Sequence, residues 1–362
     1  MTADCPSSGS LAELLSMVAE FIRLFVALLE AEATVISLWV AHCHTFGAAD
    51  TTPYLSVTSA ERRCGKTRLL ELLELLVPNP WKTDRCSAAV LSRKIDAECP
   101  ALLLDESDTA FNGSREYAEA LRGILNSGHR RGGKTSLCIS SGTTITYRDF
   151  KTFSPKVIAG IGDLPDTVAD RSIPIRLQRA ISGEVERFHR RDVEDSATQL
   201  REDLAAWAQA NVQQLRDARP SLPSELNDRQ QDGAEALLAI ADAAGGEWPE
   251  RARKALIHIL TSTEASDDSS GVRLLKDIHS ILESTGRDRI HSKRLAAELS
   301  QIESSPWAGL TVYRLARLLR QFRIGPRTIR TGRVTFKGYL RQDFETAWRR
   351  YHCQERIAPA PT

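Results

Sequence analysis

The stretch 54–77 constrains the fold more than any other part of this 362-residue chain. It begins with a short apolar, β-branched run at residues 54–58, which is typical of a buried strand. A loop then ends in Gly-Lys-Thr at 65–67, and leucines at helical spacing follow without a breaker before Pro78. Strand, loop and helix in this order are the context in which Gly-Lys-Thr forms a phosphate-binding loop.

The chemistry of such a loop follows from the start of its helix, where unpaired N–H groups and the positive end of the dipole attract an anion. Lys66 is expected to reach the β- and γ-phosphates of ATP, and the Thr67 hydroxyl to hold Mg²⁺. The usual pattern has a glycine where this chain has Ala60. The predicted nucleotide-binding positions are Ala60, Glu61, Arg62, Arg63, Cys64, Gly65, Lys66, Thr67 and Arg68.

A second apolar run, at 101–104, ends in Asp105 and Glu106. The strand is expected to deliver Asp105 to the Mg²⁺ shell, while Glu106 orients and polarises the attacking water. An acidic turn after a strand is common by itself. The phosphate-binding loop and the acidic turn together, each following a buried-strand pattern, favour a nucleotide-hydrolysing site. The predicted metal ligands are therefore Thr67 and Asp105, and the predicted catalytic residues here are Lys66, Asp105 and Glu106.

Composition excludes several other classes of protein. The net charge is +1, so any basic patch must be local. The seven cysteines are scattered without a CxxC pair, which argues against a disulfide framework or structural zinc and fits a reducing cytoplasm. The most apolar segment, 21–46, is interrupted by charges, so no membrane span is expected, and the N-terminus lacks a signal-peptide pattern.

Strands and helices alternate through the first half, which predicts a mainly parallel sheet with helices on both faces. Its N-terminal helices are expected to pack on this core, and His42 and His44 to pack or cap rather than bind a metal. The expected helices are 11–32, 33–44, 87–95, 116–125 and 164–171; the expected strands, besides 54–58 and 101–104, are 156–162 and 172–177, and the expected hairpin is 135–153.

A glycine-rich basic loop at 126–134 precedes the expected hairpin. Basic loops and hairpins on an ATPase are where nucleic-acid strands are gripped through phosphate contacts, whereas the alternative is a solvated, flexible turn. The candidate DNA-contacting residues are His129, Arg130, Arg131 and Lys134.

In this order, the phosphate loop, Leu-Leu-Leu-Asp-Glu at 102–106, the hairpin and Leu-Pro…Asp-Arg at 164–171 resemble the AAA+ core of P-loop NTPases. The order is closest to the hairpin-bearing helicase branch that includes the minichromosome maintenance helicases. More narrowly, TSAERRCGKTRLLE, NSGHRRG, AGIGDLPDTVADRSIPIRL and LNDRQQD resemble a phage- and mobile-element-associated P-loop ATPase family. That family's domain is catalogued as of unknown function and is often found near primase-type modules. The resemblance covers most of residues 35–350.

The resemblance implies roles for two further arginines. Arg171 sits where AAA+ proteins place an arginine finger, which neutralises transition-state charge on the γ-phosphate of a neighbouring subunit. The alternative for Arg171 is a salt bridge to Asp166 or Asp170. Arg229 falls where the helical lid carries a sensor arginine. One departure is that the strand 156–162 ends without the usual polar sensor residue.

The last part of the chain, 272–351, has a pattern of three helices and a hairpin that resembles a winged helix-turn-helix. Its helices are expected at 273–284, 293–303, 311–322 and 341–351, and its strands at 327–330 and 334–340. The third helix and the hairpin are basic, which favours DNA binding over a protein-interaction role for the module. Their basic residues are Arg314, Arg317, Arg320, Arg323, Arg327, Arg330, Arg333 and Lys337.

Together these patterns predict an α/β fold: an AAA+-like P-loop parallel sheet with a helical lid and a C-terminal winged helix. The expected parts are N-terminal helices (1–46), ATPase core (47–178), lid (179–261), linker (262–271), winged helix (272–351) and tail (352–362). The expected function is a cytoplasmic, Mg²⁺-dependent ATPase acting on single-stranded or forked DNA as a homo-oligomeric ring, either a helicase or a replication-initiation motor. A non-motor ATP switch and an ATP-binding scaffold that recruits a primase remain the alternatives.

Overall fold

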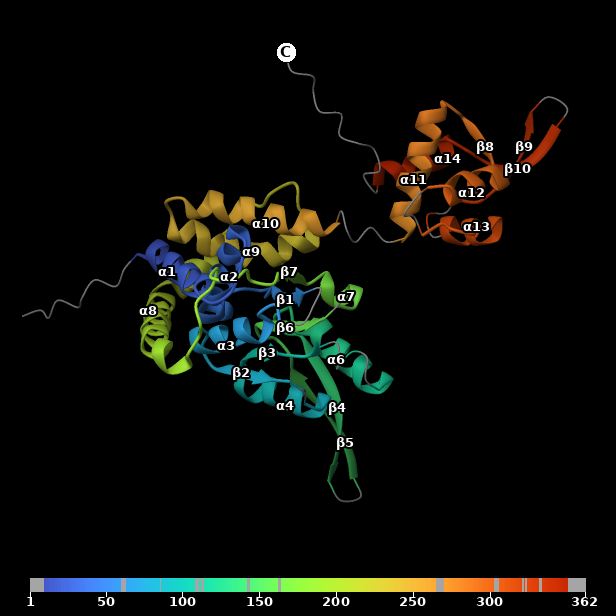
Figure 1. Cartoon of the computed structure of the whole chain (residues 1–362). Coiled ribbons are helices and arrows are strands. Elements are labelled where there is room, and N and C mark those ends of the chain that lie inside the picture. The colour runs from blue at the N-terminus through green and yellow to red at the C-terminus, as the bar shows by residue number, and fades with distance from the viewer. Residues whose placement is uncertain are drawn as a thin grey trace, which may run out of the picture. The chain divides into compact units, whose positions relative to one another are not determined.

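The structure is a computed structural model that divides into two compact units, Met1–Thr263 and Glu264–Thr362, each described here by itself (Figure 1). It describes residues 10–59, 63–84, 86–107, 111, 114–141, 144–161, 164–264, 270–302, 306–320, 322, 324–331 and 334–350.

Unit 1 is built on a five-stranded sheet in which every neighbouring pair is parallel, so the predicted parallel sheet is confirmed. All carboxyl ends consequently lie at one edge of the sheet and all amino ends at the other. The edge strand β2 was not predicted, because its segment was expected only to close the preceding helix; its first residue is Pro80, a position that needs no ladder N–H. In spatial order the strands are β2 (Pro80–Thr83), β3 (Ala101–Leu104), β6 (Lys156–Ile161), β1 (Tyr54–Ser59) and β7 (Ser172–Arg176).

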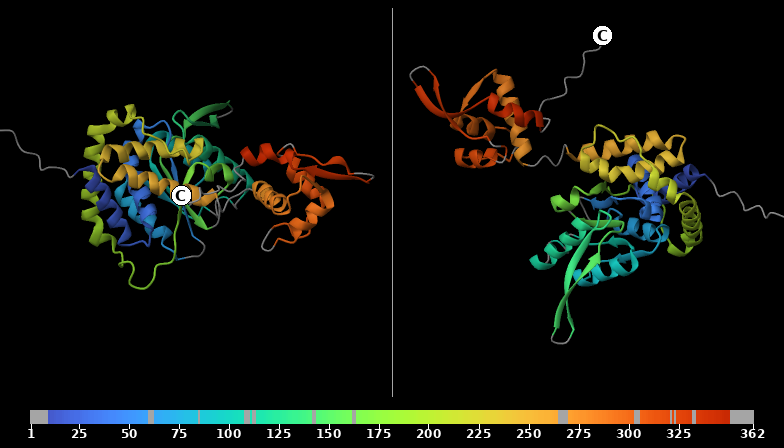
Figure 2. Two further views of the ribbon diagram at one scale, coloured as in Figure 1. Left: turned by 90° about the horizontal axis from the view of Figure 1, so that it is seen from above. Right: turned by 180° about the vertical axis from the view of Figure 1, so that it is seen from behind.

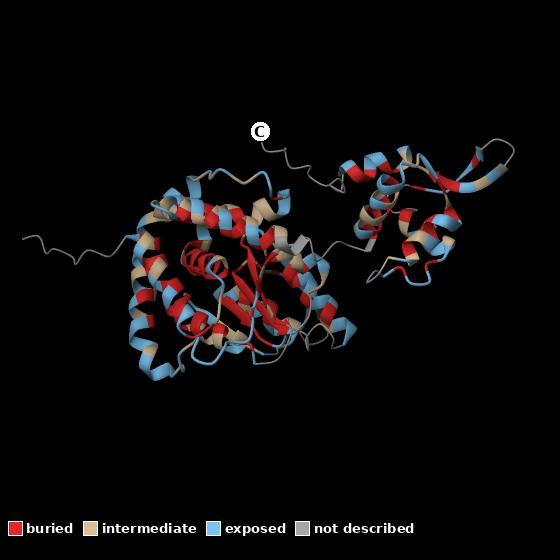
Figure 3. Ribbon diagram, turned by 45° about the horizontal axis from the view of Figure 1, so that its top comes forward, coloured by how far each residue is buried: buried red, intermediate tan, exposed pale blue. Residues whose placement is uncertain are grey.

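Alternate residues of each strand pack against different helices, as the two-residue period of a strand requires. Leu55, Leu103 and Val157 face one core, whereas Leu102 and Ile158 face the other. Figure 3 shows the sheet as a buried layer between helices whose outer sides are exposed. The first core contains α1 (Leu11–Arg23), α2 (Glu30–Thr45) and α3 (Lys66–Leu76), and the second contains α4 (Ala88–Glu98), α6 (Arg115–Ser127) and α7 (Asp166–Ala169).

The N-terminal helices differ from the expected 11–32 and 33–44. The break lies earlier because the Glu32 carboxylate accepts hydrogen bonds from the Leu29 N–H and the Arg176 N–H, both at 3.0 Å, which starts α2 at Glu30. His42 is buried and its Nε2 lies 2.8 Å from Thr52 Oγ1. His44 Nε2 lies 3.0 Å from the Leu76 carbonyl oxygen at the end of α3.

Three long helices follow the sheet: α8 (Arg190–Asp217), α9 (Asp228–Ala244) and α10 (Trp248–Glu264). They share the first core with α1 and α2. The indole N–H of Trp248 donates to the Ala12 carbonyl at 3.1 Å, and Arg251 Nε donates to Thr34 Oγ1 at 3.0 Å. Helix α10 therefore packs directly on the N-terminal helices α1 and α2.

The predicted hairpin consists of β4 (Lys134–Ser141) and β5 (Thr144–Lys151), paired antiparallel from Lys134↔Lys151 to Ser141↔Thr144. It is separate from the five-stranded sheet and projects away from it (Figures 1 and 2). Asp96 of α4 holds its base, accepting from the Lys151 N–H at 2.9 Å and from the Arg148 guanidinium at 3.2 Å.

Unit 2 has its own core, in which Trp307, Tyr339 and Trp348 are buried. Its three-stranded antiparallel sheet has the order β8-β10-β9, and β8 was missed because its three residues are too few to show a period. Helix α10 continues to Glu264 and α11 begins at Ser270, so helix occupies both ends of the expected linker. Within the described residues, no helix has the length and apolarity to cross a membrane. The elements are α11 (Ser270–Thr285), β8 (Arg289–His291), α12 (Ser292–Ser300), α13 (Val312–Arg320), β9 (Arg327–Thr331), β10 (Val334–Leu340) and α14 (Gln342–Arg350).

Candidate functional site

The loop between β1 and α3 ends at the carboxyl-terminal edge of the sheet. Gly65 is the residue before the first turn of α3 and has φ of 91°, a backbone conformation that favours glycine. Arg63 also has a positive φ, 67°, so the chain turns sharply into the helix. Cys64 between them is buried. Ala60, Glu61 and Arg62 lie outside the described residues.

Lys66, the first residue of α3, folds back toward the strand that precedes the loop. Its Nζ lies 2.5 Å from Ser59 Oγ at the end of β1. Ser59 was not among the predicted site residues, because nothing in the sequence distinguishes a serine at the end of a strand from any other. The structure adds it as the group that positions the Lys66 ammonium.

Thr67 meets the carboxylate predicted as its partner in metal binding. The Thr67 hydroxyl donates to Asp105 Oδ2 at 3.0 Å, and Asp105 is 7% exposed. Strand β6 lies between β1 and β3, so parallel packing of three strands brings the two side chains together. A hydroxyl and a carboxylate are hard oxygen donors of the kind that Mg²⁺ prefers, so these residues fit that ion.

Glu106 follows Asp105 in a left-handed backbone conformation, with φ of 51°. Its N–H donates to Asp105 Oδ1 at 2.9 Å, and its side chain is exposed. A non-glycine residue with positive φ is strained, and such strain persists where the surroundings impose it, often at functional sites. The structure thus gathers Lys66, Thr67, Asp105 and Glu106 at one edge of the sheet.

Arg68, which was predicted to bind nucleotide, contacts two other side chains. Its Nε pairs with Glu71 at 2.9 Å, and its guanidinium lies 4.3 Å from the ring centroid of Phe188, in the segment before α8. This arginine therefore links α3 to the segment that leads into the long helices.

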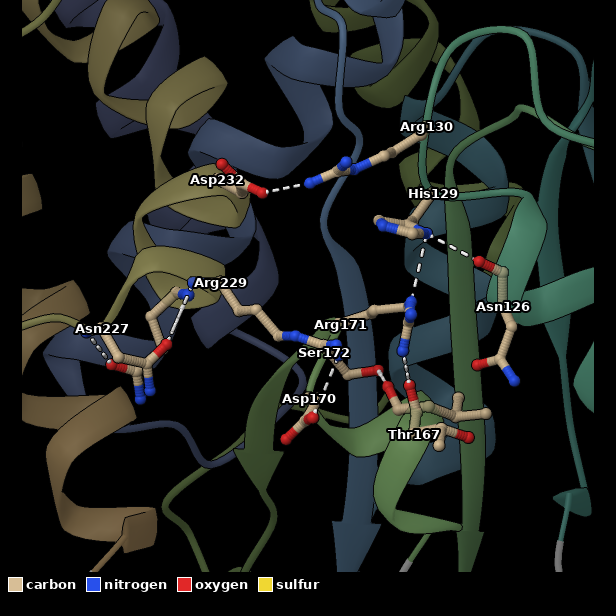
Figure 4. Close-up of polar contacts among 12 residues, drawn as sticks. Asn126, His129, Arg130, Thr167, Asp170, Arg171, Ser172, Asn227, Arg229 and Asp232 are labelled. Carbon is tan, nitrogen blue, oxygen red and sulfur yellow. Dashed lines mark hydrogen bonds and ion pairs between the residues drawn. The ribbon is translucent and has the colours of Figure 1, made fainter. Parts of the chain in front are cut away.

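Arg171 and Arg229 lie at the opposite, amino-terminal edge of the sheet. The Tyr54 N–H donates to the Arg171 carbonyl at 3.1 Å, which places Arg171 at the start of β1. Lys66 contacts Ser59 at the other end of that strand, roughly 17 Å away at about 3.3 Å per residue. Arg229 is fixed at the same edge as Arg171, because it pairs with Asp170 at 3.2 Å. The structure therefore brings Arg229 close to Arg171 (Figure 4). Both lie at the opposite edge of the sheet from the Lys66 group, as we call Lys66, Thr67, Asp105 and Glu106.

Neither of the salt bridges weighed for Arg171 is formed within the described residues. The Arg171 guanidinium contacts the Thr167 carbonyl oxygen and lies 3.2 Å from His129 Nδ1 (Figure 4). His129 Nδ1 is also 2.9 Å from the Asn126 carbonyl oxygen, and one ring nitrogen cannot donate to the carbonyl and accept from Arg171 at once.

The arginines at this edge lie close enough to affect the pKa values of their neighbours. Burial, followed by the adjacent Arg171, lowers the pKa of His129 to about 4, so its ring is neutral at physiological pH. Burial and then Arg229 lower the pKa of Arg171. The edge is thus a cluster of arginines in which His129 adds no charge.

The basic loop predicted to contact DNA makes intramolecular contacts instead of presenting free cations. Arg130 pairs with Asp232 of α9 at 2.7 Å. Arg131 pairs with Asp50 at 3.2 Å and donates to the Gly47 and Ala49 carbonyl oxygens. Lys134 lies 3.9 Å from Asp149 across the hairpin. These contacts explain the loop's basic residues without a ligand, although the side chains of Arg130, Arg131 and Lys134 remain partly accessible.

The basic residues of unit 2 are divided between α13 and the β9–β10 hairpin. Arg314, Arg317 and Arg320 are exposed on α13, while Leu315 and Leu319 bury its other side. Arg330 and Lys337 are exposed on the hairpin, and Arg327 pairs with Asp343 at 2.7 Å. Arg323 and Arg333 lie outside the described residues.

Two comparisons relate parts of the chain to other proteins. The profile of a family described as "Protein of unknown function (DUF3631)" matches residues 176–351, which include α8–α10 and most of unit 2 but not the Lys66 group. An "Uncharacterized 28.9 kDa protein in xis 5'region" from Saccharopolyspora erythraea is 36% identical over 163 residues. The matching part is 42% of this chain and 60% of that protein.

Two solved structures align with most of the chain. An apo structure of the NrS-1 C-terminal region aligns with 92% of this chain and 76% of that chain, at 12% identity and a TM-score of 0.47. A second apo structure of the region gives the same coverage and identity with a TM-score of 0.41.

Proposed function

We propose that unit 1 is an AAA+-like P-loop ATPase that requires Mg²⁺. The observation that carries this proposal is the 3.0 Å contact between Thr67 Oγ1 and Asp105 Oδ2, which joins the start of α3 to the carboxylate after β3. Mg²⁺ held by Thr67 and Asp105 would supply neutralisation of phosphate charge. Lys66 would bind the β- and γ-phosphates, and Glu106 would orient the attacking water and accept its proton.

The arginines at the amino-terminal edge belong, in this proposal, to the catalytic site of a neighbouring copy. Roughly 17 Å separates Arg171 from its own Lys66 group, more than an arginine side chain can span. A head-to-tail interface would place this edge against the next subunit's nucleotide and would close into a ring. Arg171 would then stabilise the transition state, and Arg229 would approach the same nucleotide from α9.

The proposed ATP hydrolysis is coupled to action on DNA, single-stranded or forked. Unit 2 is the proposed winged-helix module that binds this DNA. The exposed arginines of α13 support this assignment. The similarity to a protein in an xis 5′ region fits the mobile-element context expected from the sequence, and a cytoplasmic helicase or initiation motor is the role proposed there.

Two alternative functions would use the same site. A non-motor switch would hydrolyse ATP in response to DNA without separating strands. An ATP-binding scaffold, which the alanine at position 60 would suit, would bind nucleotide without turnover and recruit a partner such as a primase.

The deciding experiment measures ATP hydrolysis by the full chain with and without single-stranded and forked DNA, beside Lys66→Ala and Glu106→Gln. Turnover that rises with DNA and falls about 10²-fold or more in both variants supports the ATPase. ATP binding with turnover equal to that of Lys66→Ala overturns it in favour of the scaffold. Unwinding of the fork separates the motor from the switch.

A further inference from the structure

The near-zero net charge of the chain conceals a strong difference between its two units. Residues 264–362 contain 18 Lys and Arg against 11 Asp and Glu, whereas residues 1–263 contain 30 against 36. The excess in unit 2 is concentrated further. Between Glu303 and Asp343 the chain has nine Lys and Arg and no acidic residue. A polyanion would therefore meet a cationic unit attached to an anionic one.

Ion pairs within unit 2 neutralise four of its arginines, two before this stretch and two in it. Arg287 and Arg294 both pair with Glu298, at 2.9 and 2.7 Å. Arg341 pairs with Glu283, and Arg327 pairs with Asp343 at 2.7 Å. These side chains have partners within unit 2, so they offer an external anion little uncompensated charge.

Helix α13 presents the opposite situation. Arg314, Arg317 and Arg320 are exposed, and their guanidinium groups form no ion pair or hydrogen bond with any residue that the structure describes. Their three-residue spacing carries the three cations along about 9 Å of helix. Leu315 and Leu319 are buried on the other side, so packing of the helix on its own core leaves the arginine side outward.

The hairpin that follows this helix in the chain adds a second basic face. Thr328 pairs with Lys337 and Arg330 pairs with Thr335 across the two strands. Directly opposite residues share a face, so Arg330 and Lys337 lie on the same exposed side, whereas Ile329 is buried on the other.

We propose that α13 enters the major groove of double-stranded DNA, with Arg314, Arg317 and Arg320 on phosphates and base edges and the Arg330–Lys337 face on the adjacent backbone. This inference deepens the proposed function by naming the duplex arm of a fork as the nucleic acid that unit 2 holds. It rests on that function only for the choice of DNA as partner.

The character of the surface favours a duplex over a single strand. An α-helix about 10–12 Å across fits a major groove about 12 Å wide. Surfaces that bind single strands combine basic grooves with rows of aromatic stacking partners. Among the described residues of unit 2, Tyr313, at 86% exposure, is the one large exposed aromatic side chain. The major groove of A-form RNA is too narrow for a helix.

The test is fluorescence anisotropy of a short labelled duplex with the full chain, without nucleotide, over a range of salt concentrations. The variant combines Arg314→Gln, Arg317→Gln and Arg320→Gln. Its matched control combines Arg287→Gln, Arg294→Gln and Arg349→Gln, which removes equal charge from unit 2 outside α13. The α13 variant is expected to lose about 100-fold in affinity, and its salt slope to fall by about three, while the control changes the slope by less than about one.

Wild-type affinity in the α13 variant, or an equal loss in the control, would overturn the proposal. Preferential binding of single-stranded DNA or duplex RNA of the same sequence by wild-type protein would overturn the choice of duplex DNA. Lys66→Ala is expected to bind the duplex as wild type does. Loss of ATPase activity with intact duplex binding would count against the proposed function alone, and the reverse result against this inference alone.

Discussion

Asp170 forms its ion pair with Arg229, 59 residues further along the chain, and not with its neighbour Arg171. Arg171 instead lies against the neutral ring of His129 and a backbone carbonyl. A partly buried guanidinium that forms no direct ion pair with a described carboxylate is costly to maintain, since desolvation disfavours its charge. An anion supplied by another molecule would offset that cost. The nucleotide of a neighbouring copy would be such an anion, so Arg171 links the proposed catalysis to oligomerisation.

Mixing two inactive variants tests whether Arg171 acts between subunits. Lys66→Ala removes the proposed phosphate contact and Arg171→Ala removes the proposed arginine finger, and each is expected to lose turnover by about 10³-fold. If each interface needs Lys66 from one copy and Arg171 from its neighbour, random assembly of a 1:1 mixture leaves about a quarter of the interfaces with both residues. The mixture should therefore regain about a quarter of wild-type turnover. The measurement is steady-state ATP hydrolysis of the mixture.

The control is a 1:1 mixture of the Lys66→Ala protein with the Glu106→Gln protein. Both substitutions alter the same edge of the sheet, so this mixture should show no recovery of turnover. A mixture of Lys66→Ala and Arg171→Ala that remains inactive, or a fully active monomer, contradicts the role of Arg171 between subunits.

Thr67→Val should weaken the response to Mg²⁺. Valine has the shape of threonine but no hydroxyl, so the proposed metal ligand is lost and Asp105 Oδ2 loses its donor. The Mg²⁺ concentration for half-maximal turnover is expected to rise about tenfold or more. Thr67→Ser keeps the hydroxyl and should behave nearly as wild type. An unchanged Mg²⁺ requirement in Thr67→Val would remove Thr67 from the proposed metal site.

Ser59→Ala tests a positioning residue that the sequence did not reveal. Without the Ser59 hydroxyl, 2.5 Å from Lys66 Nζ, the ammonium is less restricted, and turnover should fall about tenfold as one oriented hydrogen bond is lost. Ser59→Thr supplies the same group and should restore most of the activity. Equal activity in the alanine and threonine variants would show that the contact has no part in catalysis.

Acidification should destabilise unit 1 through His42. Complete burial lowers the pKa of His42 to about 4, so the unfolded chain binds more protons than the folded chain between that value and about 6.5. The stability present above pH 6.5 is therefore lost as the pH falls toward 4, and from pH 7 to pH 5 this group accounts for about 2 kcal/mol.

His42→Gln keeps a donor for Thr52 and cannot titrate, so its unfolding free energy should depend less on pH by that amount. Denaturant unfolding at pH 7 and pH 5 measures the difference, to which the other histidines contribute equally in both proteins. Identical pH dependence would mean that His42 is not held neutral.

Sequence patterns predicted elements well where the local signal was strong. The apolar run at 54–58, the leucines after Lys66 and the run before Asp105 led to β1, α3 and β3 because each signal extends over a complete element. Strand β2 was missed because Pro78 and Pro80 made its segment look like the end of the preceding helix. Strand β8 was missed because three residues are too few to display a period. The arginines of the loop 126–134 illustrate another limit, since charge pattern alone does not tell a ligand contact from the ion pair between Arg130 and Asp232.

The sequence by itself determined the α/β class of unit 1 and the arginine stripe of α13, and it picked out Lys66, Thr67, Asp105 and Glu106 as candidate site residues. All of these depend on spacing within one element or one turn, which local propensity and periodicity control. The tertiary structure alone decided that Thr67 reaches Asp105 across β6, that Ser59 holds Lys66, and that Arg171 and Arg229 share the opposite edge. Those relationships depend on strand order and polarity, which arise from packing between segments far apart in the chain.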